Sequence, residues 1–363
     1  MGHAMKNYMI TIDGGTTNTR VALWNEKKEL IYAAKAEVGV RDAAKEGNSS
    51  SLKTAISSMV KEMMQGAEAA HAQVNAVYAC GMLTSNVGIL EVPHLTAPAG
   101  LREFAKGVED VLMPDICSIP ISFIPGMKNF SGEVGRDNLE QMDIMRGEET
   151  ETIALMELCK SENSVTDASG SDIRRIRQEV FPQEALYVLP GSHTKFVSVN
   201  GKGQMTGCLT SMAGELLFML TCGSVLTDAV KGQFAPETYD REMFIAGAKE
   251  TWATSLSRAV FLTRIVNQFM DGRQEACSSF LMGAVLAADI LAVKRSRALT
   301  MTKNTKVVIA GKEPLKSALK ELFIQDGTFK EVTAFQNEEH IPLSGYGMCV
   351  IAEKRACITR VGL

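Results

Sequence analysis

Residues 8–24, YMITIDGGTTNTRVALW, predict two short strands joined by a tight turn. Apolar and β-branched side chains alternate on both sides of the turn, as they do in strands of a buried sheet. The turn contains, in order, Asp13, Gly14, Gly15, Thr16 and Thr17. Two adjacent glycines let the backbone approach a ligand closely, and successive N–H groups in such a turn form a concavity that binds anions.

Asp13 ends the first predicted strand, and its carboxylate would repel a bare phosphate group. It suits a hydrated Mg2+, which binds one or two carboxylates together with water and phosphate oxygens. We therefore interpret the turn as a site for a metal-bound polyphosphate. The alternative is a plain β-hairpin whose glycines serve only the turn. The turn resembles the first phosphate loop of the actin, hexokinase and sugar-kinase ATPase superfamily, and the P-loop motif G-x-x-x-x-G-K-[ST] does not occur.

A second strand–turn–strand pattern occupies residues 185–199. Its turn and the residues after it are Gly191, Ser192, His193, Thr194 and Lys195. Their hydroxyl, imidazole and ammonium donors suit phosphate oxygens, and the alternative is a solvated basic hairpin tip. The recurrence favours two related domains that face each other across one nucleotide. A further strand at 307–310 ends at Gly311, which suits the edge of an adenosine pocket but is also a common α/β turn.

Length and composition indicate a globular enzyme. The chain has 363 residues, 45% of them hydrophobic and 22% charged, with a net charge of −4 and no basic stripe, which disfavours nucleic acid as the main partner. Its eight cysteines form no C-x-x-C pair, so we expect buried thiols in a reducing cytoplasm. We expect no signal peptide, no apolar run of membrane-spanning length and no membrane partner; a homo-oligomer stays open.

The remaining pattern predicts alternating strands and helices. Strands are expected at 30–38, 75–79, 116–124 and 204–211, and helices at 51–65, 153–158, 216–222, 278–293, from 314 and at 344–356, with 235–272 largely helical and 159–184 an excursion of loop and helix. We expect an N-terminal domain at 5–140 and a C-terminal domain at 141–343. The terminal helix, within 344–363, is expected to pack back on the first domain.

Two further stretches carry candidate site residues. The loop after strand 75–79 contains Ser85 and Asn86, which could bind hydroxyls or a carboxylate, or could equally satisfy their own turns. His94 in the same loop is more often a structural histidine. Glu148 and Glu149 open a predicted helix, where acids are stabilised by the helix dipole. One of them could instead face the site as a general base.

Four stretches together resemble the 2-dehydro-3-deoxygalactonokinases: IDGGTTNTRVALW, ACGMLTSNVGILEVPHLTAPAG, DIMRGEETE and LYVLPGSHTKF. The resemblance implies an α/β, two-domain, actin-like ATPase fold, ribonuclease H-like and duplicated, with a central cleft. It also implies ATP with Mg2+, and transfer of the γ-phosphoryl group to the 6-hydroxyl of 2-dehydro-3-deoxygalactonate in galactonate catabolism.

The resemblance also assigns roles to residues. The turns at 13–17 and 191–195 would hold the phosphates and the metal, and Gly311 would border the adenine. Ser85, Asn86 and Arg146 would hold the sugar acid, with the guanidinium of Arg146 on its carboxylate. Glu148 is the first choice of base, followed by Glu149 and Asp143. The family often has Trp at the positions of Gly14 and Ile89, and Gln at the position of Glu151.

Two rival functions stay open at this point. One is a kinase for another 2-keto-3-deoxy sugar acid. The other is a nucleotide-dependent regulator, either a sugar sensor or a chaperone-like ATPase. A sugar-responsive repressor of this fold would carry a DNA-binding helix-turn-helix ahead of the first phosphate strand. Here that strand is expected almost at the beginning of the sequence, which disfavours the regulator.

Overall fold

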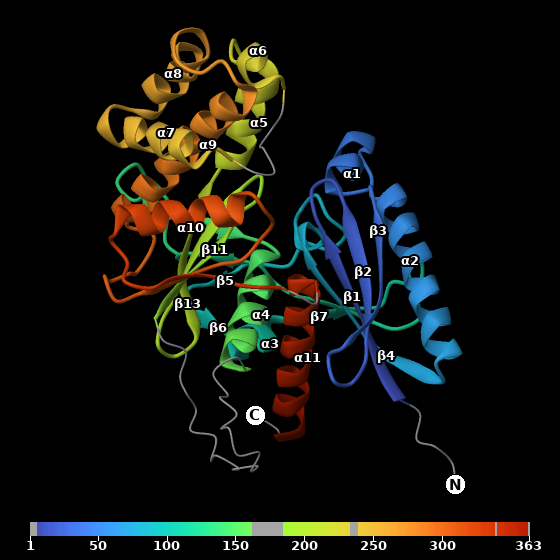
Figure 1. Ribbon diagram of the computed structural model, residues 1–363. Coiled ribbons are helices and arrows are strands. Elements are labelled where there is room, and N and C mark those ends of the chain that lie inside the picture. Colours follow the sequence, from blue (N-terminus) through green and yellow to red (C-terminus); the bar gives the residue numbers. More distant parts are fainter. Residues whose placement is uncertain (1–5, 162–183, 233–238, 338–339, 362–363) are drawn as a thin grey trace, which may run out of the picture.

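The computed structural model describes residues 6–161, 184–232, 239–337 and 340–361, and two large mixed sheets dominate it (Figure 1). The first sheet has the spatial order β3-β2-β1-β4-β8-β7. Its strands are β1 (Lys6–Gly14), β2 (Thr19–Trp24), β3 (Leu30–Ala36), β4 (Ala72–Gly81), β7 (Glu109–Val111) and β8 (Ile121–Phe123). The predicted opening hairpin is confirmed, since β1 and β2 pair antiparallel while β4 lies parallel to β1.

The second sheet repeats this arrangement. Its order is β15-β14-β11-β12-β13-β6, with strands β6 (Ala99–Gly100), β11 (Ala185–Leu189), β12 (Thr194–Val199), β13 (Gln204–Ser211), β14 (Lys306–Ile309) and β15 (Val332–Ala334). Antiparallel β11-β12-β13 correspond to β1-β2-β3, and parallel β14 and β15 correspond to β4 and β8. The duplicated α/β fold predicted from the two turns is therefore confirmed.

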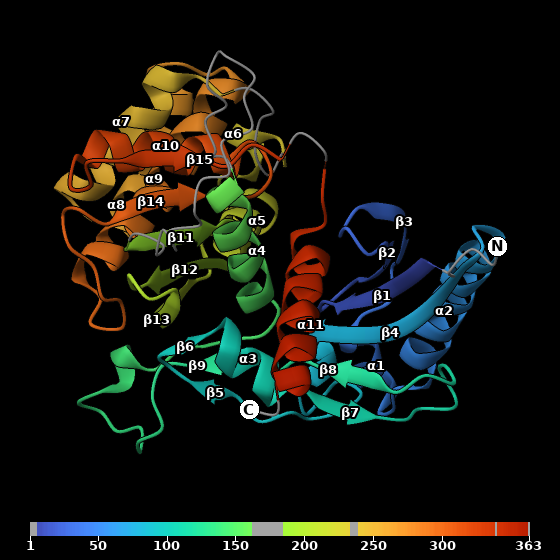
Figure 2. The same ribbon diagram turned by 90° about the horizontal axis from the view of Figure 1, so that it is seen from below.

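Short strands connect the two sheets in a way that the sequence did not predict. β5 (Leu95–Thr96), β9 (Met127–Lys128) and β10 (Ile144–Met145) form a separate three-stranded sheet, of which Figure 2 labels β5 and β9. β6, from the first third of the chain, pairs with β13 of the second sheet. Strands of two residues leave no alternation of apolar and polar side chains, so pattern alone cannot reveal them.

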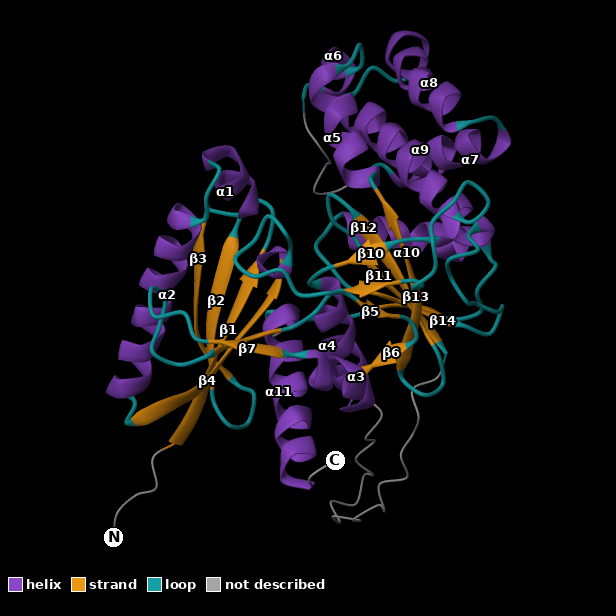
Figure 3. Ribbon diagram, turned by 180° about the vertical axis from the view of Figure 1, so that it is seen from behind, coloured by secondary structure: helices purple, strands orange, loops and turns teal. Residues whose placement is uncertain are grey.

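Helices cover the sheets and fill the space between them (Figure 3). Their bounds are α1 (Val40–Glu46), α2 (Ser50–Ala69), α3 (Leu101–Gly107), α4 (Glu148–Ser161), α5 (Ala213–Gly223), α6 (Thr227–Val230), α7 (Arg241–Ala253), α8 (Leu256–Phe269), α9 (Gln274–Arg295), α10 (Leu315–Asp326) and α11 (Leu343–Val361), with single 3-10 turns η1 (Met82–Thr84) and η2 (Leu139–Gln141). The stripe predicted for α2 is buried at Leu52, Ile56 and Met63.

The terminal helix α11 lies between the two halves of the molecule (Figure 2). It contacts β1 and β4 of the first sheet, and it also packs along α4 and α3. Helix α11 lies so close to α4 that a Cβ atom at Gly347 would be 1.9 Å from the carbonyl oxygen of Thr150. The division of the chain at residue 140 stays a prediction.

The long apolar helix α9 corrects one expectation. Its length and mean hydropathy of 1.9 would allow it to cross a membrane, although no such run was expected. However, 83% of its apolar window is buried inside the structure, as in a helix at the centre of a core. Its contact with α7 requires glycine, since a Cβ at Gly283 would lie 1.9 Å from the carbonyl oxygen of Phe244.

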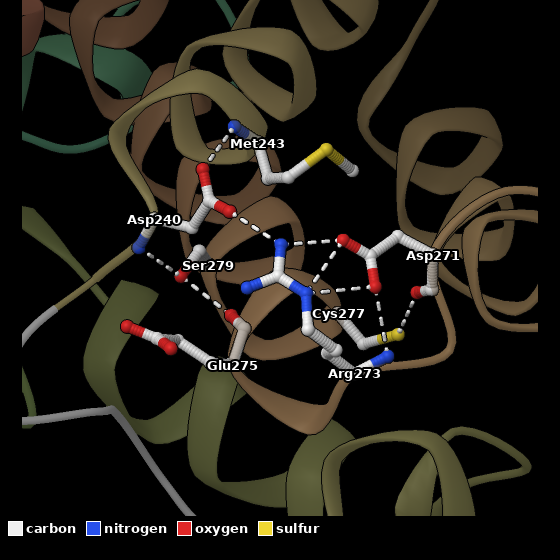
Figure 4. Close-up of polar contacts among 7 residues, drawn as sticks. All are labelled: Asp240, Met243, Asp271, Arg273, Glu275, Cys277 and Ser279. Atoms are coloured by element: carbon white, nitrogen blue, oxygen red, sulfur yellow. Dashed lines mark hydrogen bonds and ion pairs between the residues drawn. The ribbon is translucent and has the colours of Figure 1, made fainter.

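A polar cluster fastens the first turns of α7 and α9 (Figure 4). The guanidinium of Arg273 donates to Asp240, 3.0 Å away, and to Asp271. Asp240 in turn accepts from the backbone N–H of Met243, and its own N–H donates to Ser279, 2.9 Å away. The cluster caps α7 through Asp240 and joins the start of α7 to the start of α9.

Of the other predicted segments, 235–272 is helical at α7 and α8, whereas 235–238 lies outside the described residues. Strand 116–124 is shorter than predicted, since only 121–123 pair as β8. The predicted excursion at 159–184 falls almost entirely outside the described residues, apart from the end of α4.

Candidate active site

The first glycine turn is held through its carbonyl groups, by the start of helix α1. The carbonyl oxygens of Gly15 and Thr16 accept from the N–H groups of Val40 and Arg41 at the start of α1, at 3.2 and 3.0 Å. Gly39 allows this contact, because a Cβ there would lie 2.4 Å from the carbonyl oxygen of Thr16. Within the described residues, the N–H groups of Thr16 and Thr17 meet no protein acceptor. The carbonyl oxygens of Gly15 and Thr16 thus have partners, whereas the N–H groups of Thr16 and Thr17 are available to an anion.

The second turn is held in the same way. The carbonyl oxygen of Ser192 accepts from the N–H of Glu215 in the first turn of α5, at 2.9 Å. At Gly214 a Cβ would lie only 2.1 Å from the carbonyl oxygen of Gly191, so α5 touches the turn directly. Among the described residues, no acceptor meets the N–H groups of Ser192 and His193. The two turns therefore occupy corresponding places in the two sheets, and the start of a helix holds each of them.

Other residues predicted at this turn are placed around it. The His193 ring lies 2.7 Å from the Glu215 carboxylate. Thr194 is buried, and its hydroxyl has no partner in the described part of the chain. Gly311 packs on the turn itself, since a Cβ there would lie 2.8 Å from the ring of Pro190. The structure thus places Gly311 next to the second turn, and its predicted place at the adenine stays a prediction.

Asp13 lies at the end of β1, next to a cation that the sequence reasoning missed. Its carboxylate accepts from the hydroxyl of Ser344 at 2.9 Å and lies 3.4 Å from the guanidinium of Arg20. Arg20 is paired directly with Asp13 across the β1–β2 ladder. The hairpin register contained this signal, because two strands joined by a four-residue turn at 15–18 place these side chains opposite each other. A cavity of about 160 Å3 opens here, lined by both residues, Lys35 and Ser344.

Three glutamates open α4, and they differ in environment. Glu149 is fully buried, and both of its carboxylate oxygens accept from the N–H of Gly147 at 2.8 Å. Burial, with the charge of Glu148 second, raises the pKa of Glu149 to about 8. Burial, with Asp13 and then Glu148 adding to it, also raises the pKa of Glu151 to about 8. Sequence reasoning named Glu151 only as a departure from the family pattern.

Glu148 connects the two halves of the site. Burial raises its pKa, the positive charge of Lys195 opposes this shift, and the negative charge of Asp13 adds to it. Asp13 belongs to the first turn and Lys195 follows the second. The carboxylate of Glu148 therefore interacts electrostatically with a residue from each turn. Lys195 is itself buried, donating to the carbonyl oxygen of Ile144 at 2.9 Å and to Thr210 at 2.7 Å. It is therefore not a solvated basic tip.

Asp143, the third choice of base, is occupied by structural hydrogen bonds. One of its carboxylate oxygens accepts from the N–H of Thr210 at 2.6 Å, and the other accepts from the hydroxyl of the same residue at 2.7 Å. The Thr210 hydroxyl also accepts from Lys195. Asp143 therefore ties the segment before α4 to the end of β13.

Arg146 is a half-buried cation that pairs with no carboxylate among the described residues. Its guanidinium donates to the hydroxyl of Thr84 at 2.8 Å and to the carbonyl oxygen of Val92 at 2.7 Å, and it lies 3.3 Å from Nδ1 of His94. Burial, with the charge of Arg146 second, lowers the pKa of His94 to about 4. A neutral His94 can accept from Arg146, so the structural expectation for this histidine fits its surroundings.

The two predicted loop residues behave differently. The hydroxyl of Ser85 donates to the carbonyl oxygen of Met82 at 2.7 Å, so it satisfies its own turn. Asn86 is exposed beside it. Arg146 reaches the same loop through Thr84, and it therefore connects the loop to α4.

A larger cavity, about 420 Å3, lies at the other end of α4, lined by Met156, Lys160 and other residues but by no predicted site residue.

Asp13 is the residue predicted to hold a metal, and further carboxylates lie near it. The charge of Asp13 contributes to raising the pKa values of Glu148 and Glu151, while Lys195 opposes the first shift and Arg20 opposes the second. Within the described ranges no group of three or more His, Cys, Asp or Glu side chains is placed to hold a metal ion. Magnesium does not need one, because it keeps several waters and takes its other ligands from substrate phosphates.

The duplicated sheet, with a glycine turn at the corresponding place in each half, defines the class of proteins with an actin-like ATPase fold. Within it, a family model for 2-keto-3-deoxy-galactonokinase matches residues 13–338, and the chain belongs to this family.

Known proteins are similar to this chain to different degrees. The chain is 24% identical over 303 residues to the 2-dehydro-3-deoxygalactonokinase of Escherichia coli K12, covering 82% of this chain and 86% of that protein. It is similar in fold to the crystal structure of a Sinorhizobium meliloti protein provisionally assigned as a 2-dehydro-3-deoxygalactonokinase, with a TM-score of 0.67, 18% identity and coverage of 96% and 99% of the two chains. A glucokinase from Balamuthia mandrillaris is a remote likeness, with a TM-score of 0.41, 12% identity and coverage of 96% and 94%.

Proposed function

We propose that the chain is an ATP-dependent kinase that transfers the γ-phosphoryl group of ATP to the 6-hydroxyl of 2-dehydro-3-deoxy-D-galactonate. The product is 2-dehydro-3-deoxy-6-phosphogalactonate, and the reaction belongs to galactonate catabolism in the cytoplasm. Membership of the 2-keto-3-deoxy-galactonokinase family supports the reaction. The observation that carries the proposal is the pair of equivalent turns, each with its carbonyl groups tied to a helix and its N–H groups left for an anion.

The phosphates are held by the backbone donors of both turns. Thr16 and Thr17 bind them from the first sheet, and Ser192 and His193 from the second, with the neighbouring Gly14, Gly15, Gly191 and Thr194 shaping the turns. Gly311 borders the adenosine, because it packs on the second turn. Asp13 would hold a hydrated Mg2+, which would supply positive charge to the phosphate oxygens.

The sugar acid is held next to α4. Arg146 is a cation bonded only to neutral groups, so its guanidinium can still pair with the carboxylate of the substrate. Asn86 and Ser85 lie in the loop that Arg146 fastens, and they provide polar contacts to the hydroxyl groups. The half-buried position of Arg146 strengthens such a pairing, since solvent screens it less than it would screen an exposed pair.

Glu148 accepts the proton of the attacking hydroxyl. Burial raises its pKa and so makes its carboxylate a stronger base than a free glutamate, while the positive charge of Lys195 opposes that rise. The rest of the rate comes from positioning the two substrates in line and from stabilising charge on the transferred group. Closure of the two halves would exclude water and so limit the hydrolysis of ATP without an acceptor.

The substrate is tested by measuring ADP release with a panel of 2-keto-3-deoxy sugar acids in a coupled assay. The highest kcat/KM is expected with 2-dehydro-3-deoxy-D-galactonate. A higher value with another acid of the panel would keep the kinase and change its substrate. ADP release that no acid stimulates would contradict the kinase and support a nucleotide-dependent regulator.

A further inference from the structure

The apolar helix α9 contains one buried carboxylate for which the proposed reaction has no use. Asp289 is 3% exposed in a helix whose neighbouring side chains are almost all apolar. One of its carboxylate oxygens accepts from the hydroxyl of Ser211, and the other meets no partner in the described part of the chain. Burying a carboxyl group is costly, so its place in this core needs a reason.

Ser211 connects Asp289 to helix α5. It is the last residue of β13, and its hydroxyl donates to Asp289 while accepting from the N–H of Ala213 at 3.1 Å. The first N–H groups of a helix have no partner inside the helix, so Ser211 supplies one. Asp289 fixes the rotation of the Ser211 hydroxyl. Once its O–H points toward Asp289, the lone pairs of the same oxygen point in other directions, where one accepts from the N–H of Ala213.

The first turn of α5 in turn holds the second phosphate turn. Gly214 lies against the carbonyl oxygen of Gly191, and the N–H of Glu215 donates to the carbonyl oxygen of Ser192 at 2.9 Å. A continuous set of hydrogen bonds and close contacts thus runs from Asp289 through Ser211 and α5 to the turn. No other described side chain reaches Ser211 from the helical layer.

We propose that Asp289 is a positioning residue for nucleotide binding: by fixing Ser211 and the start of α5, it sets the second turn in its phosphate-binding conformation. The inference rests on the proposed kinase function, which supplies the nucleotide. Burial raises the pKa of Asp289 to about 7, in keeping with a carboxyl group that serves as a hydrogen-bond partner inside the core. The role requires an acceptor oxygen at this position, and it does not require a charge.

Four variants test the role. Asp289→Ala and Ser211→Ala each break the connection and are expected to weaken the binding of ATP by about tenfold, the effect of losing one well-placed hydrogen bond. The double variant is expected to bind ATP no more weakly than either single variant, because both break the same connection. Asp289→Asn keeps an acceptor for the Ser211 hydroxyl and is expected to bind ATP as the wild type does.

The binding of a non-hydrolysable ATP analogue is measured by calorimetry on folded protein, beside kcat and the KM values for ATP and the sugar acid. The KM for ATP is expected to rise while the KM for the acid stays unchanged. Ser278→Ala is the matched control, since it removes another buried hydroxyl of α9 that has no described partner. Circular dichroism and melting temperature show whether each variant is folded.

Wild-type affinity for the analogue in Ser211→Ala, or in a folded Asp289→Ala, would overturn the inference and leave the kinase proposal intact. Equal weakening in Asp289→Asn and Asp289→Ala, with Ser211→Ala normal, would also overturn it. If Asp289→Ala does not fold, Ser211→Ala and Asp289→Asn still decide the question. A wild-type protein that binds no ATP analogue would contradict the proposed function itself.

Discussion

At the scale of single residues, Glu148 is the group on which the proposed chemistry depends most. It lies at the start of α4, and its pKa responds to Lys195 from one half of the molecule and to Asp13 from the other. The competing carboxylates have other tasks. Glu149 is closed in by Gly147, and Asp143 is bonded twice to Thr210.

Replacing Glu148 by Gln is expected to lower kcat by about 100-fold or more, the usual contribution of a general base. ATP binding should stay intact, because the amide keeps the size of the side chain. Asp13→Ala should abolish turnover instead, since the metal loses its protein anchor. Steady-state kinetics and calorimetry with an ATP analogue check both variants. Full activity in Glu148→Gln would exclude it as the base.

The carboxyls of α4 also predict how stability depends on pH. Glu151 has a pKa of about 8 in the folded protein and about 4.5 as its ordinary value. The folded state therefore binds more protons than the unfolded state between these values, so this group makes stability fall as pH rises from about 4.5 to about 8. Glu151→Gln should be more stable than wild type at pH 8.5 and show little difference at pH 4.

Urea unfolding of both proteins at several pH values measures this effect. Glu157→Gln is the control, because Glu157 lies on the same helix but is partly exposed and pairs with Lys160. An equal pH dependence in Glu151→Gln and wild type would mean that the carboxyl of Glu151 is ionised in the folded protein at neutral pH.

At the scale of elements, a helix start supports each phosphate turn. The start of α1 meets the turn after β1, and the start of α5 meets the turn before β12. In both cases a glycine allows the contact, Gly39 in the first and Gly214 in the second. Helix α5 therefore packs against the second turn and supports it, in addition to contributing side chains to the hydrophobic core.

Gly214→Ala is expected to displace the second turn and to weaken ATP binding more than tenfold, because the new Cβ would lie 2.1 Å from the carbonyl oxygen of Gly191. Gly223→Ala is the matched control, since it lies at the other end of α5 with no atom within 4 Å of a Cβ there. Titration with an ATP analogue compares the two. Equal affinity in both variants would show that the turn does not depend on α5.

Many of the helices and strands could be predicted from the sequence. Both hairpins, α2, β13, α9 and α11 follow from apolar periodicity and glycine placement, which are local properties. The short strands β5, β6, β9 and β10 could not be found, because their pairing depends on residues far away in the chain. The same limit applies to Asp289, since a lone Asp in an apolar helix gives no sign of the distant Ser211 that it contacts.

At the scale of the whole molecule, the duplicated topology places one phosphate turn on each sheet, and α11 with α4 lies between them. A nucleotide that touches both turns, with a sugar acid beside Arg146, would hold the two halves together. The sequence predicted this arrangement from the recurrence of the turn. The role of each site residue stays a prediction until a ligand is bound.

Binding of both substrates is therefore expected to make the molecule more compact than either ligand does alone. Small-angle X-ray scattering measures the radius of gyration of the free protein, of the complexes with an ATP analogue or the sugar acid, and of the complex with both. The smallest value is expected with both ligands. An unchanged radius in all four samples would contradict closure of the two halves.

The central claim is that two equivalent turns hold one triphosphate from opposite sides. A crystal structure with Mg2+ and a non-hydrolysable ATP analogue tests it most directly. We predict phosphate oxygens within hydrogen-bond distance of the N–H groups of both Thr16–Thr17 and Ser192–His193, with the metal on the Asp13 side. A triphosphate bound at only one turn, or away from both, would contradict the account.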